Sequence, residues 1–257
     1  MIDIAPAEAG FSAERLERIT EHLERNYVEP GKIAVVTNGI ELDRFHPRPR
    51  DAALAAELGF AGKLVAGYIG THGLAHGLET ILDAAALVRA RPGGGDFRFL
   101  LLGDGADKER LKRLACERGL DNVRFVDTVS KEDVPRYWSL LDVSIIHLKR
   151  AELFKTVIPS KLFESMGMGI PVLLGVEGES AEILAEAGAG EAFAPGDAGA
   201  LADALRRLRA EPELASAWRR RGPAAARGYD RAELAARMEE VLEGVASGKR
   251  AETKVTR

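Results

Sequence analysis

The fold of this 257-residue chain is decided by residues 153–175, LFKTVIPSKLFESMGMGIPVLLG. The stretch opens as a polar loop, and Pro159 stands where a helix is expected to begin, because proline is favoured at the start of a helix. Residues 160–168 then predict a short helix that two glycines bring to an end. The apolar side of this helix is expected at three positions: Leu162, Phe163 and Met166. Residues 170–174 follow as a short, fully buried strand.

The start of this helix has the chemistry of an anion site. The first turn of a helix presents free backbone N–H groups and the positive end of the helix dipole. Ser160 and Lys161 lie in that turn, and Glu164, one turn later, can reach a diol beside the anion. A phosphate beside a diol is the shape of a nucleotide. The alternatives are an ordinary helix–strand unit with a surface glutamate, and a lysine that is only solvated.

The same stretch resembles the signature of the large retaining GT-B glycosyltransferase family, family 4-like, that includes sucrose- and mannosyl-transferring enzymes. Its members usually carry two glutamates eight positions apart, the first on the donor sugar and the second on the ribose. Glu164 matches the second glutamate, whereas Thr156 occupies the position of the first. The segment KTVIPSKLFE is also similar to amino-sugar transferases that build bacterial surface polysaccharides. The resemblance implies donor contacts at Thr156, Ser160, Lys161 and Glu164, with Lys161 and Glu164 in the catalytic roles.

Around this stretch, apolar runs of strand length alternate with helical patterns. Strands are predicted at 63–70, 97–103, 122–127, 142–148 and 171–175, with an edge strand at 190–194. Helices are predicted at 77–90, 106–118, 131–141 and 160–168, and C-terminal helices at 197–209, 213–227 and 231–246. Continuous apolar strands separated by helices predict a parallel sheet covered on both faces. This is the α/β, Rossmann-like, doubly wound fold, and the resemblance implies that it is a single GT-B lobe.

The turn after the first predicted strand, YIGTHGLAHGLETI, is the second candidate for phosphate contact. Gly70 and Gly73 allow the backbone to approach a phosphate, and Thr71 adds a hydroxyl donor. Most relatives in the resembling family carry an arginine and a lysine here, whereas this chain has His72 and His76, which match the GTHG form of the amino-sugar subfamily. The four-residue spacing of these histidines would also suit a metal, but no third ligand lies nearby in the sequence. We therefore expect a site without metal.

The next two turns supply weaker candidates. Gly103 follows the second predicted strand, where a glycine either faces a ligand or ends the strand for steric reasons. The resemblance implies that the third turn holds the nucleotide base through its backbone, from Asp127 through Thr128 to Val129. The alternative is an ordinary loop that leads into a helix capped by Ser130, with Asp133 at the capping-box position.

Composition limits the partners and the compartment. The formal net charge of −4 provides no general attraction to nucleic acid. The single cysteine, Cys116, can form no internal disulfide, and its helical context predicts that it packs as a small apolar residue. A secretory signal and a spanning segment are not visible, so we expect a cytoplasmic protein. Arginines occupy positions 206, 207, 209, 219, 220 and 221. They suit peripheral contact with anionic lipid at the inner membrane face, and the alternative is that they lie on ordinary solvated helix faces.

The N-terminal part differs from the rest. Residues 1–31 are expected to form a helical segment, and residues 1–34 weakly resemble the N-terminal helix of serine hydrolases related to β-lactamases. No serine in this chain has a lysine three positions later, so the hydrolase activity is excluded and only ancestry or a plain amphipathic helix is left. The donor-binding domain is then expected at 32–246, followed by a disordered tail at 247–257.

These observations predict the donor-nucleotide-binding lobe of a retaining glycosyltransferase. The expected substrate is a nucleotide-diphospho-sugar, in particular a UDP-linked N-acetyl amino sugar, bound without a metal or another cofactor. GT-B enzymes need two lobes, so a first-lobe polypeptide or a dimer partner is the expected protein partner. One alternative is a non-catalytic module that holds a nucleotide or a partner. The other is a lobe of a UDP-amino-sugar epimerase, which the missing acid/base pairs at the strand ends disfavour.

Overall fold

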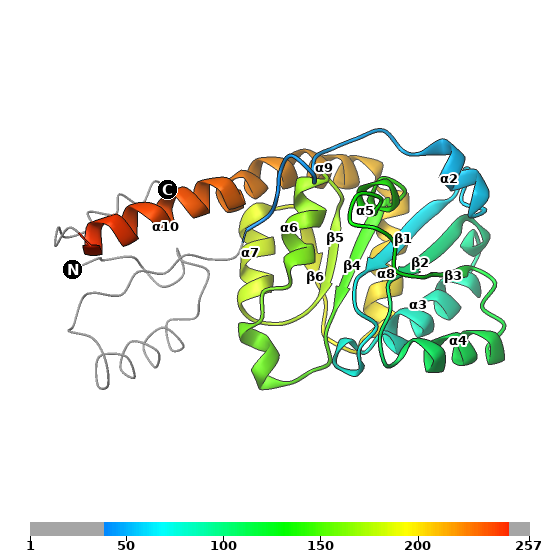
Figure 1. Cartoon of the computed structure of the whole chain (residues 1–257). Helices are drawn as coiled ribbons and strands as arrows, with labels where there is room; N and C mark the ends of the chain where they lie inside the picture. The colour runs from blue at the N-terminus through cyan, green and yellow to red at the C-terminus, as the bar shows by residue number, and fades with distance from the viewer. Residues whose placement is uncertain (1–38, 247–257) are drawn as a thin grey trace.

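Residues 39–246 are described by the computed structural model, and they form a six-stranded parallel sheet with helices on both faces (Figure 1). The strands are β1 (Leu64–Ile69), β2 (Phe97–Leu102), β3 (Val123–Val126), β4 (Val143–His147), β5 (Val172–Gly175) and β6 (Gly190–Ala192). Their order, β3-β2-β1-β4-β5-β6, is that of a Rossmann sheet. The predicted fold is confirmed, including the edge strand. The predictions for residues 1–31 and for the tail lie outside the described residues.

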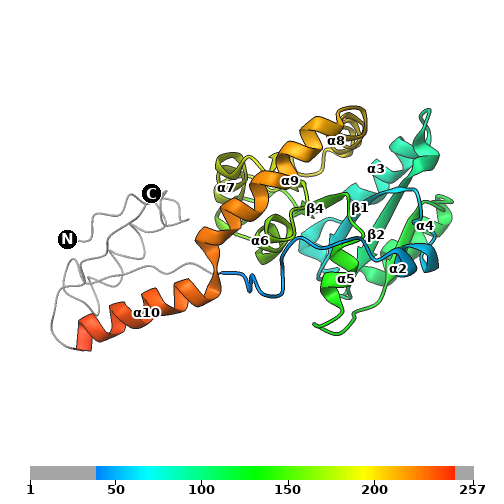
Figure 2. The same ribbon diagram turned by 90° about the horizontal axis from the view of Figure 1, so that it is seen from above.

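The helices form two layers, one on each face of the sheet. They are α2 (Ala52–Glu57), α3 (Glu79–Arg89), α4 (Lys108–Glu117), α5 (Val134–Trp138), α6 (Ser160–Gly167), α7 (Glu179–Ala187), α8 (Ala198–Ala210), α9 (Pro212–Ala226) and α10 (Arg231–Ala246). Figure 2 shows α5 and α6 on one side of the strands and α3 and α8 on the other. Trp138, Phe163 and Leu184 belong to the apolar core on the first side, whereas the second core contains Ile81, Leu111 and Leu205. Burial of these two cores is what holds the layers together.

Helix α6 begins and ends as its sequence predicts. Pro159 takes the N-cap position with an extended backbone, and the helix runs from Ser160 to Gly167. All three predicted apolar positions are buried: Leu162, Phe163 and Met166. Gly169 then has a φ of +66°, a conformation that favours glycine, and the chain turns into β5. The N-terminus of α6 is thereby placed at the carboxyl ends of the strands.

Three local predictions need correction. Helices α2 and α7 were not predicted, because α7 contains only two large apolar residues, Ile183 and Leu184, which are too few to reveal a period. Helix α5 is shorter than predicted: Ser130 Oγ does accept from Asp133 N at 3.2 Å, but residues 131–133 form a turn before the helix. Cys116 is exposed on α4, because the buried side of that helix is taken by Leu111 and Ala115.

The arginine-rich surface is largely compensated by carboxylates. Four of the six arginines form ion pairs: Arg206 with Asp203, Arg207 with Glu191, Arg209 with Asp96, and Arg219 with Asp142. Paired guanidinium groups attract lipid phosphates less than free ones, so this surface matches solvated helix faces better than a lipid patch. Within the described part of the chain, no helix is long and apolar enough to cross a bilayer.

The loops after β1 and β2 pack directly against each other. His72 N donates to Asp104 O at 2.8 Å, and Asp107 N donates to His72 O at 2.9 Å. Gly103 has a φ of +139°, and a Cβ at this position would lie 1.9 Å from Gly70 O. Glycine is therefore required at residue 103 by the contact between the two loops, whether or not a ligand is bound.

This contact makes the substitution Gly103→Ala a test of how the two loops are held. We expect a loss of about 2–4 kcal/mol in the free energy of unfolding, because the added methyl group meets backbone and the φ is unfavourable for alanine. Gly119→Ala is the matched control: Gly119 has a φ of +61° with open space around it, so only the conformational cost of about 1–2 kcal/mol applies. Urea unfolding of both variants gives the comparison, and equal losses would contradict this account.

Candidate functional site

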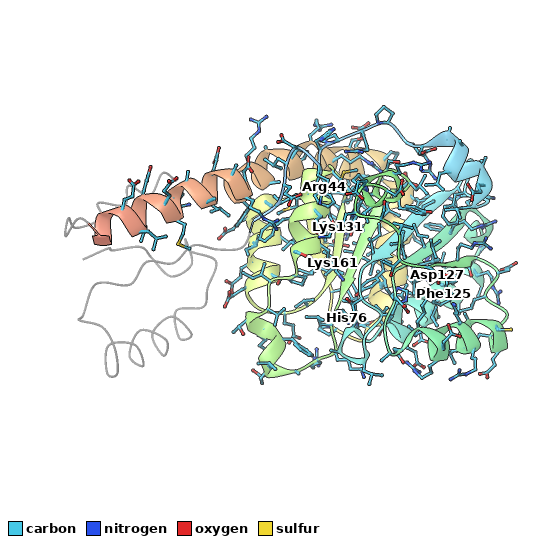
Figure 3. All side chains as sticks on the ribbon, in the orientation of Figure 1. Arg44, His76, Phe125, Asp127, Lys131 and Lys161 are labelled. Atoms are coloured by element: carbon cyan, nitrogen blue, oxygen red, sulfur yellow. The ribbon has the colours of Figure 1, made fainter. Side chains whose placement is uncertain are left out.

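A cleft of about 590 Å³ opens at the carboxyl ends of β1 and β4. These two strands are neighbours at the point where the strand order reverses, which is where doubly wound sheets bind ligands. Its lining residues are Gly39, Ile40, Glu41, Arg44, Phe45, Ile69, Gly70, Thr71, His76, Lys131, Val134, Ile146, His147, Leu148, Val157, Pro159, Ser160, Lys161, Glu164 and Arg231. Figure 3 places Lys161, Lys131, Arg44 and His76 along this region of the molecule.

Lys161, in the first turn of α6, is held at one end of the cleft. Its Nζ donates to the hydroxyl of Tyr68 at 2.8 Å and lies 4.0 Å from the centroid of the Tyr68 ring. Among residues 39–246 it forms no ion pair with a carboxylate. Burial lowers the pKa of Lys161 to about 8. The negative charge of Glu164 opposes this decrease only in part. The cleft thus contains an ammonium group whose counter-ion is not supplied by the described protein.

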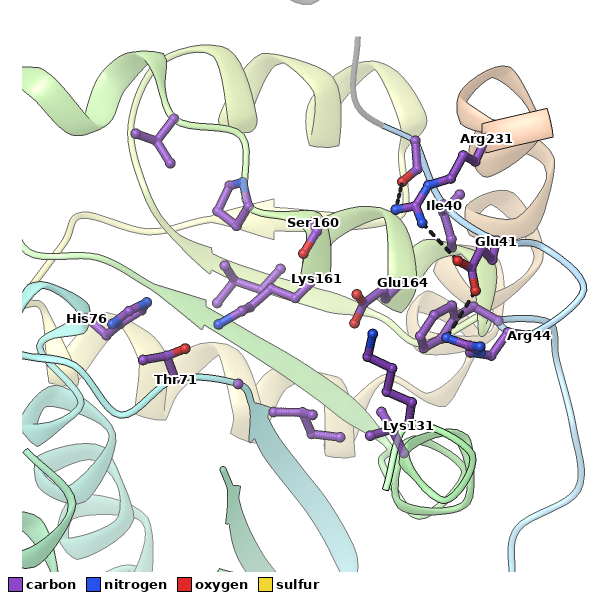
Figure 4. A pocket seen from close by; sticks show the side chains of 18 of the residues that line it. Ile40, Glu41, Arg44, Thr71, His76, Lys131, Ser160, Lys161, Glu164 and Arg231 are labelled. Carbon is purple, nitrogen blue, oxygen red and sulfur yellow. Dashed lines mark hydrogen bonds and ion pairs between the residues drawn. The ribbon is translucent and has the colours of Figure 1, made fainter. Parts of the chain in front are cut away.

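Gly70 makes room for that ammonium group. Its φ is +143°, and a Cβ on Gly70 would lie 2.7 Å from Lys161 Nζ. The backbone of the loop after β1 therefore comes close to both the cation and the first turn of α6. Thr71 lies next to it and lines the same wall (Figure 4). Backbone N–H groups, a hydroxyl group and an ammonium group together suit an anion with several oxygen atoms.

Glu164 and a group of basic residues form the other end of the cleft. Burial raises the pKa of Glu164, and the charges of Lys161, Arg231 and Arg44 oppose that rise. Figure 4 shows the side chain of Lys131 extending toward Glu164. The carboxyl oxygens of Glu164 at this position are suited to accept hydrogen bonds from hydroxyl groups.

Glu41 joins two of these arginines into one unit. Its carboxylate pairs with Arg231 at 2.8 Å and with Arg44 at 3.0 Å, and Arg231 also donates to Gly39 O at 3.2 Å (Figure 4). Overall, the lining contains four cationic side chains and two carboxylates, which leaves an excess of two positive charges. This excess matches the two negative charges of a diphosphate diester.

The two histidines that line the cleft, His76 and His147, both have a lowered pKa. His147 is buried, with Nδ1 2.7 Å from His76 O and Nε2 accepting from Gly196 N at 2.9 Å. One ring nitrogen must therefore donate and the other accept, and burial lowers the pKa of His147. Burial also lowers the pKa of His76. Neither ring competes with Lys161 for the charge of an anion at neutral pH.

The structure brings together only part of the predicted site. Five predicted residues line the cleft: Gly70, Thr71, Ser160, Lys161 and Glu164. The other six lie outside the lining: His72, Gly73, Gly103, Thr128, Val129 and Thr156. His72 is fully buried, and neither ring nitrogen has a hydrogen-bond partner. Thr156 ends the short 3-10 helix η4 (Glu152–Thr156), where its hydroxyl donates to Leu153 O at 3.3 Å.

Two of the turns serve other contacts. Asp127, at the end of β3, pairs with Lys108 Nζ at 2.5 Å and lies apart from Lys161 (Figure 3). Lys108 Nζ also donates to Gly103 O at 2.6 Å, so it joins the loops after β2 and β3. No cluster of three or more His, Cys, Asp or Glu side chains able to hold a metal ion occurs between residues 39 and 246.

Sequence reasoning did not distinguish His76, which lines the cleft, from His72, and it missed the cations from distant segments. Arg44 and Arg231 are far apart in the chain, and no local pattern shows that Glu41 brings them together. Lys131 had a weak signal, because it directly follows the turn that was predicted to hold the base.

A Rossmann-type sheet with a cationic cleft at its switch point is an arrangement typical of nucleotide-binding domains. The sequence model of the family "Glycosyl transferases group 1" matches residues 51–225, and the chain belongs to that family. The C-terminal domain of a group 1 glycosyltransferase (LpcC) from Francisella tularensis aligns over its whole length, with 75% of this chain covered, 20% identity and a TM-score of 0.63. The prediction of a single GT-B lobe, the C-terminal one, is confirmed.

Curated relatives are longer than this chain. D-inositol 3-phosphate glycosyltransferase of Streptomyces avermitilis is 30% identical over 228 residues, which cover 84% of this chain and 46% of that protein. The probable glycosyltransferase WbjE of Pseudomonas aeruginosa is 28% identical over 198 residues, which cover 74% of this chain and 48% of that protein. The Anabaena protein HepE, solved with UDP and glucose, has 20% identity and a TM-score of 0.70 over 82% of this chain and 56% of its own. The chain therefore spans about half the length of these proteins.

The unpaired ammonium group has a consequence for stability. We expect Lys161→Met to raise the free energy of unfolding at pH 7 by about 1–2 kcal/mol, because the variant need not bury a charge and the partial contact of Lys161 with water limits the gain. Lys161 has a pKa of about 8 in the folded protein, below the ordinary value of 10.5 for the unfolded chain. The folded protein then loses the proton first as pH rises, so the advantage of the variant shrinks between pH 8 and about 10.5.

Urea unfolding at several pH values measures this effect. Lys112→Met is the control, because Lys112 lies at the surface and pairs with Glu109 at 2.9 Å. The control should change little across the same range. An advantage of Lys161→Met that grows between pH 8 and 10 would contradict the burial of an unpaired charge.

Proposed function

We propose that the cleft binds the diphosphate and ribose of a UDP-linked sugar, and that this chain is the donor-binding part of a retaining glycosyltransferase. The observation that carries the proposal is the ammonium group of Lys161, held without a carboxylate partner between Gly70 and the N-terminus of α6. A permanent anion in the cleft supplies the counter-ion that the described protein does not. Family membership supports the choice of a nucleotide sugar over other anions.

The diphosphate and the ribose take opposite ends of the cleft in this proposal. The N–H groups of the first turn of α6, the loop at Gly70 and Thr71, and Lys161 bind the diphosphate. Glu164 accepts hydrogen bonds from the ribose hydroxyl groups, one helical turn away. Lys131 and Val134 then lie on the side where the base would sit, next to the turn at Thr128 and Val129. Base contacts at Thr128 and Val129, and a sugar contact at Thr156, require these residues to move toward the ligand.

The same groups would lower the barrier to transfer. When the bond between the anomeric carbon and the diphosphate breaks, negative charge grows on the leaving diphosphate. Lys161 and the backbone donors already point into the cleft, so they stabilise that charge without reorganisation. Four cationic side chains in the lining supply the positive charge that a bound metal ion supplies elsewhere. We therefore propose donor binding that is independent of divalent metal.

The donor is proposed to be a UDP-linked N-acetyl amino sugar used in surface polysaccharide synthesis. The segments GTHG and KTVIPSKLFE support it through their similarity to the amino-sugar subfamily. Relatives named for colanic acid and teichuronic acid biosynthesis support the polysaccharide context. Thr156 in place of a glutamate argues for a donor that does not depend on a carboxylate at that position.

A non-catalytic, donor-holding role for the isolated chain is the second candidate function. The chain aligns with about half the length of its relatives, and the cleft is lined by groups that suit a nucleotide-sugar donor. Helix α10 also extends away from the sheet, with Met238 and Leu242 exposed (Figure 1). Transfer would then require a first-lobe polypeptide that faces the cleft.

The ribose contact is tested with Glu164→Gln. We expect UDP affinity to fall by about 1.5–3 kcal/mol, because the substitution removes the charge that strengthens the hydrogen bonds from the diol. Isothermal calorimetry with UDP, GDP and ADP, each with Mg²⁺ and with EDTA, gives the affinities and the base preference. Glu182→Gln is the control, because Glu182 is an exposed residue of α7. Unchanged UDP affinity in folded Glu164→Gln would remove Glu164 from the site.

Catalysis by the chain alone is tested separately. An acceptor hydroxyl must be held about 3–3.5 Å from the anomeric carbon by groups that face the donor. We expect the isolated chain to bind UDP weakly and to transfer no sugar, whatever acceptor is offered, and a separate first-lobe polypeptide to restore transfer. Incubation with radiolabelled UDP-sugars and a panel of acceptors checks this. Sustained glycoside formation that Lys161→Ala abolishes would show that one lobe is sufficient.

A further inference from the structure

Tyr68 touches both walls of the diphosphate end of the cleft. It is the penultimate residue of β1 (Leu64–Ile69), and its side chain is fully buried. Its hydroxyl donates to Thr71 O at 2.8 Å and accepts from Lys161 Nζ at 2.8 Å. Thr71 belongs to the loop after β1 and Lys161 to the first turn of α6, so a single oxygen atom links the two elements.

The direction of these bonds is fixed by the chemistry of the phenol. A phenol has one proton, and the carbonyl of Thr71 takes it, because a carbonyl can only accept. The bond to Lys161 must therefore run from nitrogen to oxygen. Burial raises the pKa of Tyr68 well above its ordinary value, so the phenol remains neutral and keeps this arrangement.

The ring of Tyr68 supports the same cation from a second direction. Lys161 Nζ lies 4.0 Å from the ring centroid, within the range of a cation–π contact. A Cβ on Gly70 would lie 2.7 Å from Nζ and 3.9 Å from the Tyr68 hydroxyl. The ammonium group is therefore confined between the ring, the phenol oxygen and the backbone of Gly70.

The groups around this arrangement add little competing charge. His72 and His76 both contact the Tyr68 ring, with centroid distances of 5.9 and 6.0 Å. Burial lowers the pKa of His72 to about 4 and also lowers that of His76, so both rings are neutral near pH 7. Glu164, on the same helix as Lys161, is the carboxylate whose charge acts on the ammonium group. Lys161 is thus the cation of this end of the cleft, and Tyr68 is its hydrogen-bond partner.

Only the hydroxyl distinguishes Tyr68 from a residue that merely fills the core, and it takes part in two hydrogen bonds, one to Thr71 O and one from Lys161 Nζ. Phenylalanine would fill the same space in the core between the strand and its helices, and the phenol already has an acceptor in Thr71 O. The bond from Lys161 is therefore not required to satisfy Tyr68. It is Lys161 that would lack a hydrogen-bond partner among the described residues if the phenol were removed.

We propose that Tyr68 is a positioning residue, whose hydroxyl and ring hold the Lys161 ammonium group charged and fixed against the Gly70 loop, ready for a diphosphate. The identity of the anion rests on the proposed function. The link between Tyr68 and Lys161 does not, because it is present without ligand and can be measured without one. Nucleotide binding and the link can therefore fail independently.

The first experiment measures the link in the ligand-free protein. Competitive labelling of lysines with acetic anhydride at a series of pH values, followed by mass spectrometry, gives the pKa of Lys161. We expect Tyr68→Phe to lower this pKa by about one to two units from its value near 8, because a hydrogen bond to the charged form is lost. Lys112, which pairs with Glu109 at the surface, is an internal control in the same sample. Tyr137→Phe is the control variant, because it removes a different phenol hydroxyl. An unchanged Lys161 pKa in folded Tyr68→Phe overturns the proposal.

The second experiment measures what the link does for binding. We expect Tyr68→Phe to weaken UDP binding about tenfold and to leave uridine binding unchanged, because uridine has no diphosphate. In a Lys161→Met background, adding Tyr68→Phe should change UDP affinity less than twofold, since the phenol acts through the lysine. A tenfold loss that persists in that background, or an equal loss for uridine, overturns the positioning role.

The outcomes separate the two proposals. If wild type binds no UDP while Tyr68→Phe lowers the Lys161 pKa, the nucleotide proposal fails and the positioning of the ammonium group stands. If wild type binds UDP, and Tyr68→Phe changes neither the Lys161 pKa nor the UDP affinity, the positioning role of Tyr68 fails and the nucleotide proposal stands. Circular dichroism and urea unfolding of Tyr68→Phe and Tyr137→Phe confirm that each variant is folded before either comparison is made.

Discussion

The cleft depends on one electrostatic constraint, the burial of the Lys161 ammonium group with no carboxylate partner among residues 39–246. A cation in the first turn of a helix also opposes the helix dipole, so two unfavourable terms act on the same atom. Tyr68 compensates in part through a neutral hydrogen bond and a ring face, neither of which cancels the charge. A carboxylate at this point would stabilise the ligand-free protein more, but it would occupy the place of an anionic ligand. The arrangement therefore favours a bound anion at a cost to the empty fold.

That constraint requires the Gly70 loop to be held in place, and close packing at glycines allows this. Gly103 and Gly105 allow the loop after β2 to press against the backbone of Gly70 and His72, where a Cβ would approach within 1.9 and 2.6 Å. Lys108 then ties Gly103 O to Asp127 at the end of β3. The contacts of both glycines are to backbone, so the shape of the Gly70 loop is set by its neighbours and not by a ligand. A loop fixed in this way can keep an ammonium group in place with no counter-ion.

The sequence predicted the sheet and the start of α6 because these depend on local patterns. Continuous apolar strands and the Pro159–Ser160 start of the helix are visible in a few consecutive residues. It did not distinguish His72 from His76: both lie in one glycine-rich turn, and only the backbone path shows that the first is buried and the second reaches the cleft. Nor did it predict the unit of Arg44, Glu41 and Arg231, whose assembly depends on the tertiary fold. Features set by consecutive residues could be predicted from the sequence, whereas contacts between residues far apart in the chain could not.

The two ends of the cleft differ in what holds them. The Lys161 end, where we propose that the diphosphate binds, consists of β1, its loop and α6, all anchored in the core of the sheet. The Glu164 end, which we propose for the ribose, depends on the segment at Ile40 and the start of α10. These two are joined by hydrogen bonds from Ile40 N to Tyr229 O and from Arg231 N to Ile40 O, both 2.8 Å long. Displacement of α10 would carry Arg231, and with it the pairing of Glu41, away from the cleft while leaving Lys161 in place. The anion end is thus set by the core of the domain, whereas the cationic wall near Glu164 follows the position of α10.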